Sequence, residues 1–191
     1  MSERSVKPTG EPLFREVQHF SQWWMRLLMF FPVAIVLFGG YVRFVLNQPF
    51  GHIGPKPAPL WLDSMMFLLI GFGIPLLYYS MKLVIEVFPE GFYFRFYPFH
   101  WHWHRIAMTD IQKVTAKTYR PILEYGGWGI RYGVSGKAYN VSGNQGVLIE
   151  FNEGKKILFG SQKMLEMEMI LKQYLAKSSS SYLNTSIRES N

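Results

Sequence analysis

Two long apolar runs near the start of the chain limit what it can fold into. Residues 27–42 contain no charged side chain, and residues 60–81 contain one, Asp63. A helix needs ~20 apolar residues to cross the hydrocarbon core of a bilayer. Because an arginine near a helix end can extend to the interface, Arg43 is compatible with a first span that continues to residue 46. The sequence therefore predicts two transmembrane helices, at 27–46 and 60–82. The alternative, two buried helices of a soluble bundle, is disfavoured because soluble helices seldom stay apolar on every side for this long.

The ends of both runs carry residues that favour a membrane–water interface. Aromatic and basic side chains gather there because one part of each is apolar and the other is polar. The residues that we assign to the interface at these ends are Trp23, Trp24, Arg26, Trp61 and Lys82. Leu13, Val17, Phe20 and Trp24 recur at helical spacing, so we expect residues 1–26 to form a tail and an amphipathic helix lying in the interface.

The segment between the runs, residues 47–59, is short and rich in proline and glycine, so it predicts an antiparallel hairpin. Its one lysine or arginine is Lys56, whereas basic residues flank both runs on their other sides. Membrane proteins retain such basic segments on the cytoplasmic side. We therefore expect a multi-pass protein of the plasma membrane with an external loop at 47–59 and both termini in the cytoplasm.

After residue 82 the apolar runs become short and are separated by turn residues. Strand candidates occupy 83–88, 92–97, 101–108 and 111–119, and the segments VLIEF and KKILF flank an NEG turn. Residues 162–177 have the spacing of a closing helix, with Ser161 as its N-cap, and the polar segment 178–191 is expected to be disordered. Many strands followed by one helix predict an α+β, mainly-β domain at 83–177, built as an antiparallel barrel or sandwich.

This order of elements resembles the bacterial membrane-anchored pleckstrin-homology-like (PH-like) proteins. The similarity rests on two apolar helices, an EGF turn between strands, the segment RIAMTDIQKV, and GVLIEFNEGKKILFGS before a helix. It implies a PH-like domain of about seven antiparallel strands closed by a C-terminal helix on the cytoplasmic side. It implies no known reaction and brings no catalytic residues, and the segment FHWHWH departs from the usual pattern.

Composition narrows the chemistry and the partners. The chain has no cysteine, which rules out disulfides, thiolate metal sites and cysteine nucleophiles. Its formal net charge is +7, which suits an anionic membrane face or a nucleic acid. Because no nucleic-acid recognition motif is present and the basic domain is tethered to two spans, we expect lipid headgroups or another membrane protein as the partner, and no nucleic acid.

A glycine-rich segment, YGGWGIRYGVSGK at residues 125–137, is the first candidate binding site. Backbone amides of such a segment can surround an anion, with basic side chains adding charge. The residues proposed for this role are Gly126, Gly127, Gly129, Arg131 and Lys137. The alternative is a tightly bent strand pair in which glycine only lets the backbone turn.

Three histidines at alternate positions, His100, His102 and His104, are the second candidate. On a strand they share one face, and two of them, with a third ligand from elsewhere, suit a zinc ion. Because i and i+4 lie ~13 Å apart on a strand, one ion cannot bind all three. Two other interpretations remain. In one, Trp101 and Trp103 belong to the core of a half-exposed strand and the histidines face water; in the other, the two tryptophans lie against the bilayer surface.

The expected function is a binding or scaffolding module carried by a membrane protein. No nucleophile-and-base pattern or paired carboxylates mark an enzyme, so we expect neither catalysis nor a cofactor. The alternative function is a metal-dependent membrane enzyme that uses the histidine strand.

Overall fold

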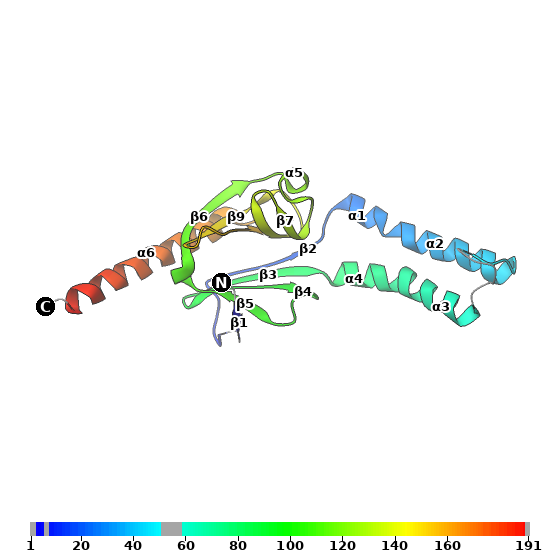
Figure 1. The fold of residues 1–191 in the computed structure, drawn as a ribbon, viewed down its shortest axis with the longest axis horizontal. Helices are drawn as coiled ribbons and strands as arrows, with labels where there is room; N and C mark the ends of the chain where they lie inside the picture. The colour runs from blue at the N-terminus through cyan, green and yellow to red at the C-terminus, as the bar shows by residue number, and fades with distance from the viewer. Residues whose placement is uncertain (1–2, 6–7, 51–58, 190–191) are drawn as a thin grey trace. The chain divides into compact units, whose positions relative to one another are not determined.

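The computed structural model describes the backbone of residues 3–5, 8–50 and 59–189, and the side chains of residues 8–50 and 59–177. It divides into two compact units, which are described separately (Figure 1). The helical unit is Phe20–Met81. The sheet-rich unit joins Met1–His19 to Lys82–Asn191.

The helical unit consists of two helices. In the first, α1 (Trp23–Leu28) and α2 (Phe30–Gly40) are followed by a π-helical turn at Tyr41–Val45. In the second, α3 (Leu60–Leu68) leads through a π-helical turn, Leu69–Gly73, into α4 (Ile74–Ser80). The stretches Trp23–Val45 and Leu60–Ser80 are long and apolar enough to cross a membrane. They coincide closely with the two predicted spans, whereas the predicted loop at 47–59 lies largely outside the described residues.

Small residues let these helices approach closely. A side chain at Gly39 would place its Cβ 2.9 Å from the ring of Phe67 on α3, and one at Gly71 would lie 3.2 Å from Val36. At one end of the pair the Arg43 guanidinium binds the carboxylate of Asp63 at 2.7 Å. The two charged residues within the apolar runs therefore neutralise each other.

The sheet-rich unit contains two five-stranded sheets and a long helix. The first sheet is antiparallel, in the order β1 (Glu3–Ser5), β5 (Trp103–Ile106), β4 (Gly91–Tyr97), β3 (Lys82–Phe88), β2 (Phe14–His19). The order in the second is β6 (Ile111–Thr118), β9 (Gln145–Phe151), β10 (Lys156–Gly160), β8 (Gly136–Asn140), β7 (Gly129–Gly133), with β8 and β10 parallel. The prediction of about seven antiparallel strands is therefore wrong in number and in one pairing.

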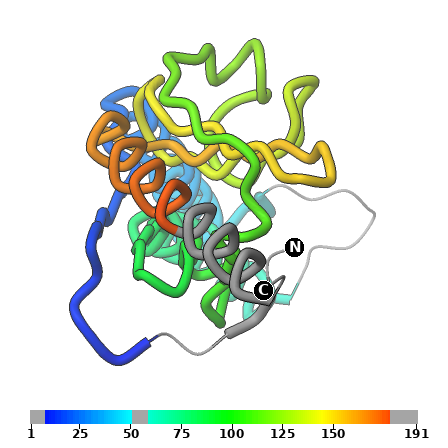
Figure 2. The backbone as a smooth tube through the Cα atoms, turned by 90° about the vertical axis from the view of Figure 1, so that its left-hand side faces the viewer, coloured from blue at the N-terminus to red at the C-terminus, as the bar shows by residue number. Residues whose placement is uncertain are grey.

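Aromatic rings from the two sheets form the core between them. Phe94 of the first sheet lies 4.8 Å, centroid to centroid, from both Tyr139 and Phe159 of the second. The helix α6 (Met164–Glu189) packs against β6 and β9 and buries Met167 and Leu171 completely. Its course past the sheets can be followed in Figure 2. The backbone stays helical through Glu189, so the prediction of a disordered tail from residue 178 is wrong there.

The N-terminal segment belongs to this unit and not to an interfacial helix, which corrects the prediction for residues 14–19. Strand β2 pairs antiparallel with β3 from Phe14↔Val87 to His19↔Lys82. Buried and exposed side chains alternate along β2. The buried Glu16 carboxylate accepts hydrogen bonds from Ser161 Oγ at 2.6 Å and from the Gln162 amide at 2.9 Å. Because the buried Glu16 carboxylate finds hydrogen-bond donors near the start of α6, the segment forms a strand with a two-residue period despite its helical spacing of apolar residues.

Candidate functional site

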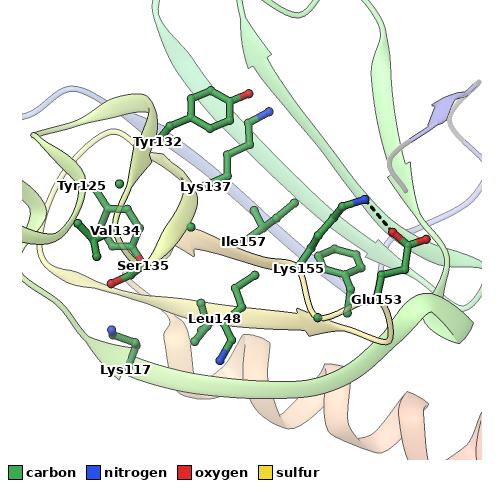
Figure 3. Close-up of a pocket in the computed structure, with 15 residues that line it drawn as sticks. Lys117, Tyr125, Tyr132, Val134, Ser135, Lys137, Leu148, Glu153, Lys155 and Ile157 are labelled. Atoms are coloured by element: carbon green, nitrogen blue, oxygen red, sulfur yellow. Dashed lines mark hydrogen bonds and ion pairs between the residues drawn. The ribbon is translucent and has the colours of Figure 1, made fainter.

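A pocket of about 880 Å³ opens between the β7–β8 hairpin and the β9–β10 hairpin of the second sheet (Figure 3). Its apolar surface comes from side chains of both hairpins and of β9, among them Val134, Leu148 and Ile157. Leu148 packs on the buried cluster formed by Tyr119, Tyr125, Ala138 and Leu158, so this wall of the pocket rests on the core. The size and lining match those of small-molecule sites in proteins.

Four lysines surround the apolar surface: Lys117, Lys137, Lys155 and Lys156. Three of them pair with carboxylates at 2.7–2.9 Å: Lys117 with Glu124, Lys155 with Glu153, and Lys156 with Glu150. The pairs of Lys155 and Lys156 lie at the surface, where an ion pair contributes only ~0–1 kcal/mol, so another anion can compete for these two ammonium groups.

Lys137 differs from the other three because phenol rings hold it. Its ammonium lies 4.6 Å from the ring centroid of Tyr139 and 5.1 Å from that of Tyr132. Burial lowers the pKa of Lys137, but hydrogen bonds with the two phenol groups outweigh it, so that pKa is raised above its ordinary value. The lysine is therefore a charged, positioned cation at neutral pH, and the pocket suits a ligand with an anionic group and an apolar part.

The glycine-rich segment does not form the predicted anion site. The amides of Gly126, Gly127 and Gly129 donate to the carbonyls of Ile122 and Pro121 and to Asn140 Oδ1 at 2.9, 2.9 and 3.0 Å. Arg131 folds back over this loop and donates from Nε to the Trp128 carbonyl at 2.8 Å. Lys137 is paired in register with Tyr132, whereas the neighbouring Arg131 is paired with Ala138, so alternation puts the two basic side chains on opposite faces of the hairpin.

The histidines also lie differently from the predicted strand. A turn follows Pro98, and β5 begins only at Trp103, so the ring centroids of His100 and His104 come within 4.3 Å of each other while His102 points into solvent. The prediction that i and i+4 would be kept apart is therefore wrong. Among the residues that the structure describes, no group of three or more His, Asp or Glu side chains could hold a metal ion.

The tryptophans assigned to the interface have different surroundings. In the helical unit Trp23, Trp24 and Trp61 are exposed, as is the neighbouring Arg26. In the sheet-rich unit Trp101 is exposed, whereas Trp103 is partly covered by the Arg95 guanidinium, 5.0 Å from its ring centroid. Lys82 begins β3, with its ammonium 5.7 Å from the ring of Tyr97.

Sequence reasoning missed most of the pocket. Of its four lysines it singled out only Lys137, and it did not assign Tyr132 or Leu148 to a site. The signal that brings them together is the parallel pairing of β8 with β10, in which Lys137 lies opposite Ile157. No local pattern marks that pairing, because the two strands are joined through β9.

Searches of curated proteins and of solved structures find no match to this chain. A family model does match, over residues 5–177, which takes in both helices, strands β2 to β10 of the two sheets and the first part of α6. The chain therefore belongs to DUF6141, a family of unknown function.

Proposed function

We propose that this chain is an integral membrane protein that crosses the bilayer twice and whose sheet-rich unit, of PH-like type and on the cytoplasmic side, binds anionic lipid headgroups. The observation that carries the proposal is the pocket in which Lys137, held between two tyrosines, lies beside an apolar surface. An amphiphilic anion satisfies both features, since its charged group meets the ammonium and its apolar part covers Val134 and Ile157, which is paired with Lys137 on the same face of the sheet.

Lipid is favoured over a protein partner by the way the chain is connected. Strand β2 ends at His19 and α1 begins at Trp23, while α4 ends at Ser80 and β3 begins at Lys82. Three residues span at most ~11 Å, so a bilayer crossed by these helices begins close to the sheet-rich unit and supplies lipid at high local concentration.

The test uses the full chain in a neutral detergent, titrated with short-chain phosphatidic acid or, for comparison, short-chain phosphatidylcholine. Binding is measured by native mass spectrometry and by the thermal unfolding midpoint. We expect phosphatidic acid to bind more tightly, and Lys137→Met to weaken it about tenfold, equivalent to ~1.4 kcal/mol.

Lys163→Met is the matched control, because this exposed lysine lies in the turn directly before α6 and does not line the pocket. Equal binding of the two lipids, or equal loss in both variants, would overturn the proposal.

A further inference from the structure

Four large apolar side chains project from neighbouring segments of the sheet-rich unit. Ile122 and Leu123, on the short helix α5 (Pro121–Tyr125), are 66% and 73% exposed. Tyr132 and Val134, at the end of the β7–β8 hairpin, are 76% and 102% exposed. We call these four residues the apolar tip. The segments α5 and β7 contact each other, and exposed apolar patches on a protein mark interaction surfaces.

The fold holds the apolar tip in place. Tyr125, the last residue of α5, is buried, and the helix ends at Gly126, whose φ of 73° is the left-handed conformation that favours glycine. Gly133 lies directly against α5, since a Cβ there would come within 2.1 Å of the Glu124 carbonyl oxygen. The tip is therefore a built surface and not a pair of loose loops.

Basic residues flank the apolar tip. Arg120 and Arg131 are exposed beside α5 and on β7. The nearest carboxylate, Glu124, binds Lys117 at 2.9 Å and accepts a 2.7 Å hydrogen bond from the Arg120 amide. An apolar surface with a positive border complements an anionic bilayer, whose headgroups attract cations while its acyl region accepts the apolar side chains.

The apolar tip also lies at a suitable end of its unit. Figure 1 shows α5 and β7 at the end of the sheet-rich unit where β2 stops and β3 starts. Residues 20–22 and Met81 are the whole of the connection from this end to the two helices. The chain length therefore keeps this end near any bilayer that the helices cross.

We propose that the apolar tip inserts into the interface of the anionic leaflet that the two helices cross, so that the sheet-rich unit is fixed against the membrane by a third contact. The inference rests on the spans of the proposed function, but not on lipid binding in the pocket. Two of its residues, Tyr132 and Val134, also line the pocket, so insertion would present the pocket opening to lipid.

The absence of cysteine makes a direct test available, because single-cysteine variants need no background substitutions. Leu123→Cys and Val134→Cys are labelled with an environment-sensitive fluorophore and reconstituted as full chains, one copy per lipid nanodisc. The matched control is Gln173→Cys, at an exposed position on α6. Nanodiscs are prepared with and without lipids that carry a nitroxide quencher at the headgroup boundary.

We expect the label at residues 123 and 134 to shift to shorter wavelength and to lose emission to the lipid quencher, while the label at residue 173 does neither. A blue shift without lipid quenching would mean burial against protein and would overturn the inference, as would signals equal to those of the control. Repeating the measurement with Lys137→Met separates the two proposals, because the pocket substitution removes headgroup selectivity but leaves the quenching of the tip.

Discussion

His100 and His104 lie where the two sheets meet. The ring of His104 stacks on Phe94 at 5.3 Å, and that of His100 lies 5.6 Å from Tyr139 of the other sheet. Burial, together with the neighbouring His104 and Lys137, lowers the pKa of His100 from 6.5 to about 4. The imidazole is therefore neutral in the folded protein at pH values where the unfolded chain already binds a proton.

This difference predicts a pH dependence of stability with a defined sign. Above pH 6.5 neither state protonates His100, and its contribution is fully present. As the pH falls from 6.5 to about 4, only the unfolded state gains the proton, so the free energy of unfolding decreases across this window. We expect His100→Gln to flatten the pH dependence of the thermal midpoint there, with a substitution of the exposed His102 by Gln as the matched control. Equal slopes in wild type and His100→Gln would contradict the assignment.

The same histidines show what a residue pattern can establish. Alternation assumed one straight strand through His100, whereas β5 begins only at Trp103. The turn after Pro98 brings His100 back toward Phe96, whose carbonyl accepts its amide at 2.8 Å. A local period cannot show where the chain turns, because the aromatic residues on both sides of Pro98 are good strand formers.

Strand β2 gives the sharpest contrast at the scale of elements. An interfacial helix would place Val17 on its apolar face, whereas the strand exposes Val17 by 43% and leaves Phe14 only 2% exposed. We expect Phe14→Ala to cost ~3–5 kcal/mol of unfolding free energy and Val17→Ala less than ~0.5 kcal/mol. Denaturant or thermal unfolding of both variants measures the difference. A larger loss of unfolding free energy for Val17→Ala than for Phe14→Ala would favour the interfacial helix over the strand.

Elements with local partners were predicted best. Strands β3 and β4 are joined by a tight turn, and β9 and β10 flank an NEG turn, so hydrophobic runs and turn residues were sufficient. In contrast, residues 20–81 separate β2 from its partner β3 in the sequence. The polar side chains of β2 contact residues still farther along the chain, Gly160 and Ser161. Because no local pattern encodes a partner so distant, its helical spacing was misleading.

The pair of Arg43 and Asp63 makes a prediction for the helical unit. Each side chain is only about one-sixth exposed, at 15% and 16%, in surroundings that are otherwise apolar. Asp63→Ala leaves the arginine without its carboxylate, which costs ~3–5 kcal/mol for a buried pair. The exchange Arg43→Asp with Asp63→Arg should recover most of that stability. The thermal midpoint in detergent tests this, and no recovery in the exchanged protein would mean that the pair does not link the helices.

For the whole molecule, the prediction of a sheet-rich domain next to two apolar helices agrees with the structure, but its internal arrangement was not predictable. The pocket needs the β7–β8 hairpin beside β10. The sequence offered a tightly bent strand pair there only as the alternative to an anion site, and it named no neighbouring strand. The amides of the glycine-rich segment bind Ile122, Pro121 and Asn140. The glycines therefore shape the loop that leads into this hairpin, and their amides are engaged within the protein.

The orientation of the chain in the membrane is the remaining prediction. Basic residues flank both apolar helices on the side of the sheet-rich unit, with Arg15 and Arg26 before the first and Lys82 after the second, so that side is expected in the cytoplasm. In intact cells a membrane-impermeant maleimide should label Gln48→Cys, just after the first helix. It should label Gln173→Cys, on α6, only after permeabilisation. The reverse pattern would mean that the protein has the opposite orientation in the membrane. Labelling of both positions in intact cells would mean that residues 48 and 173 lie on the same, external side.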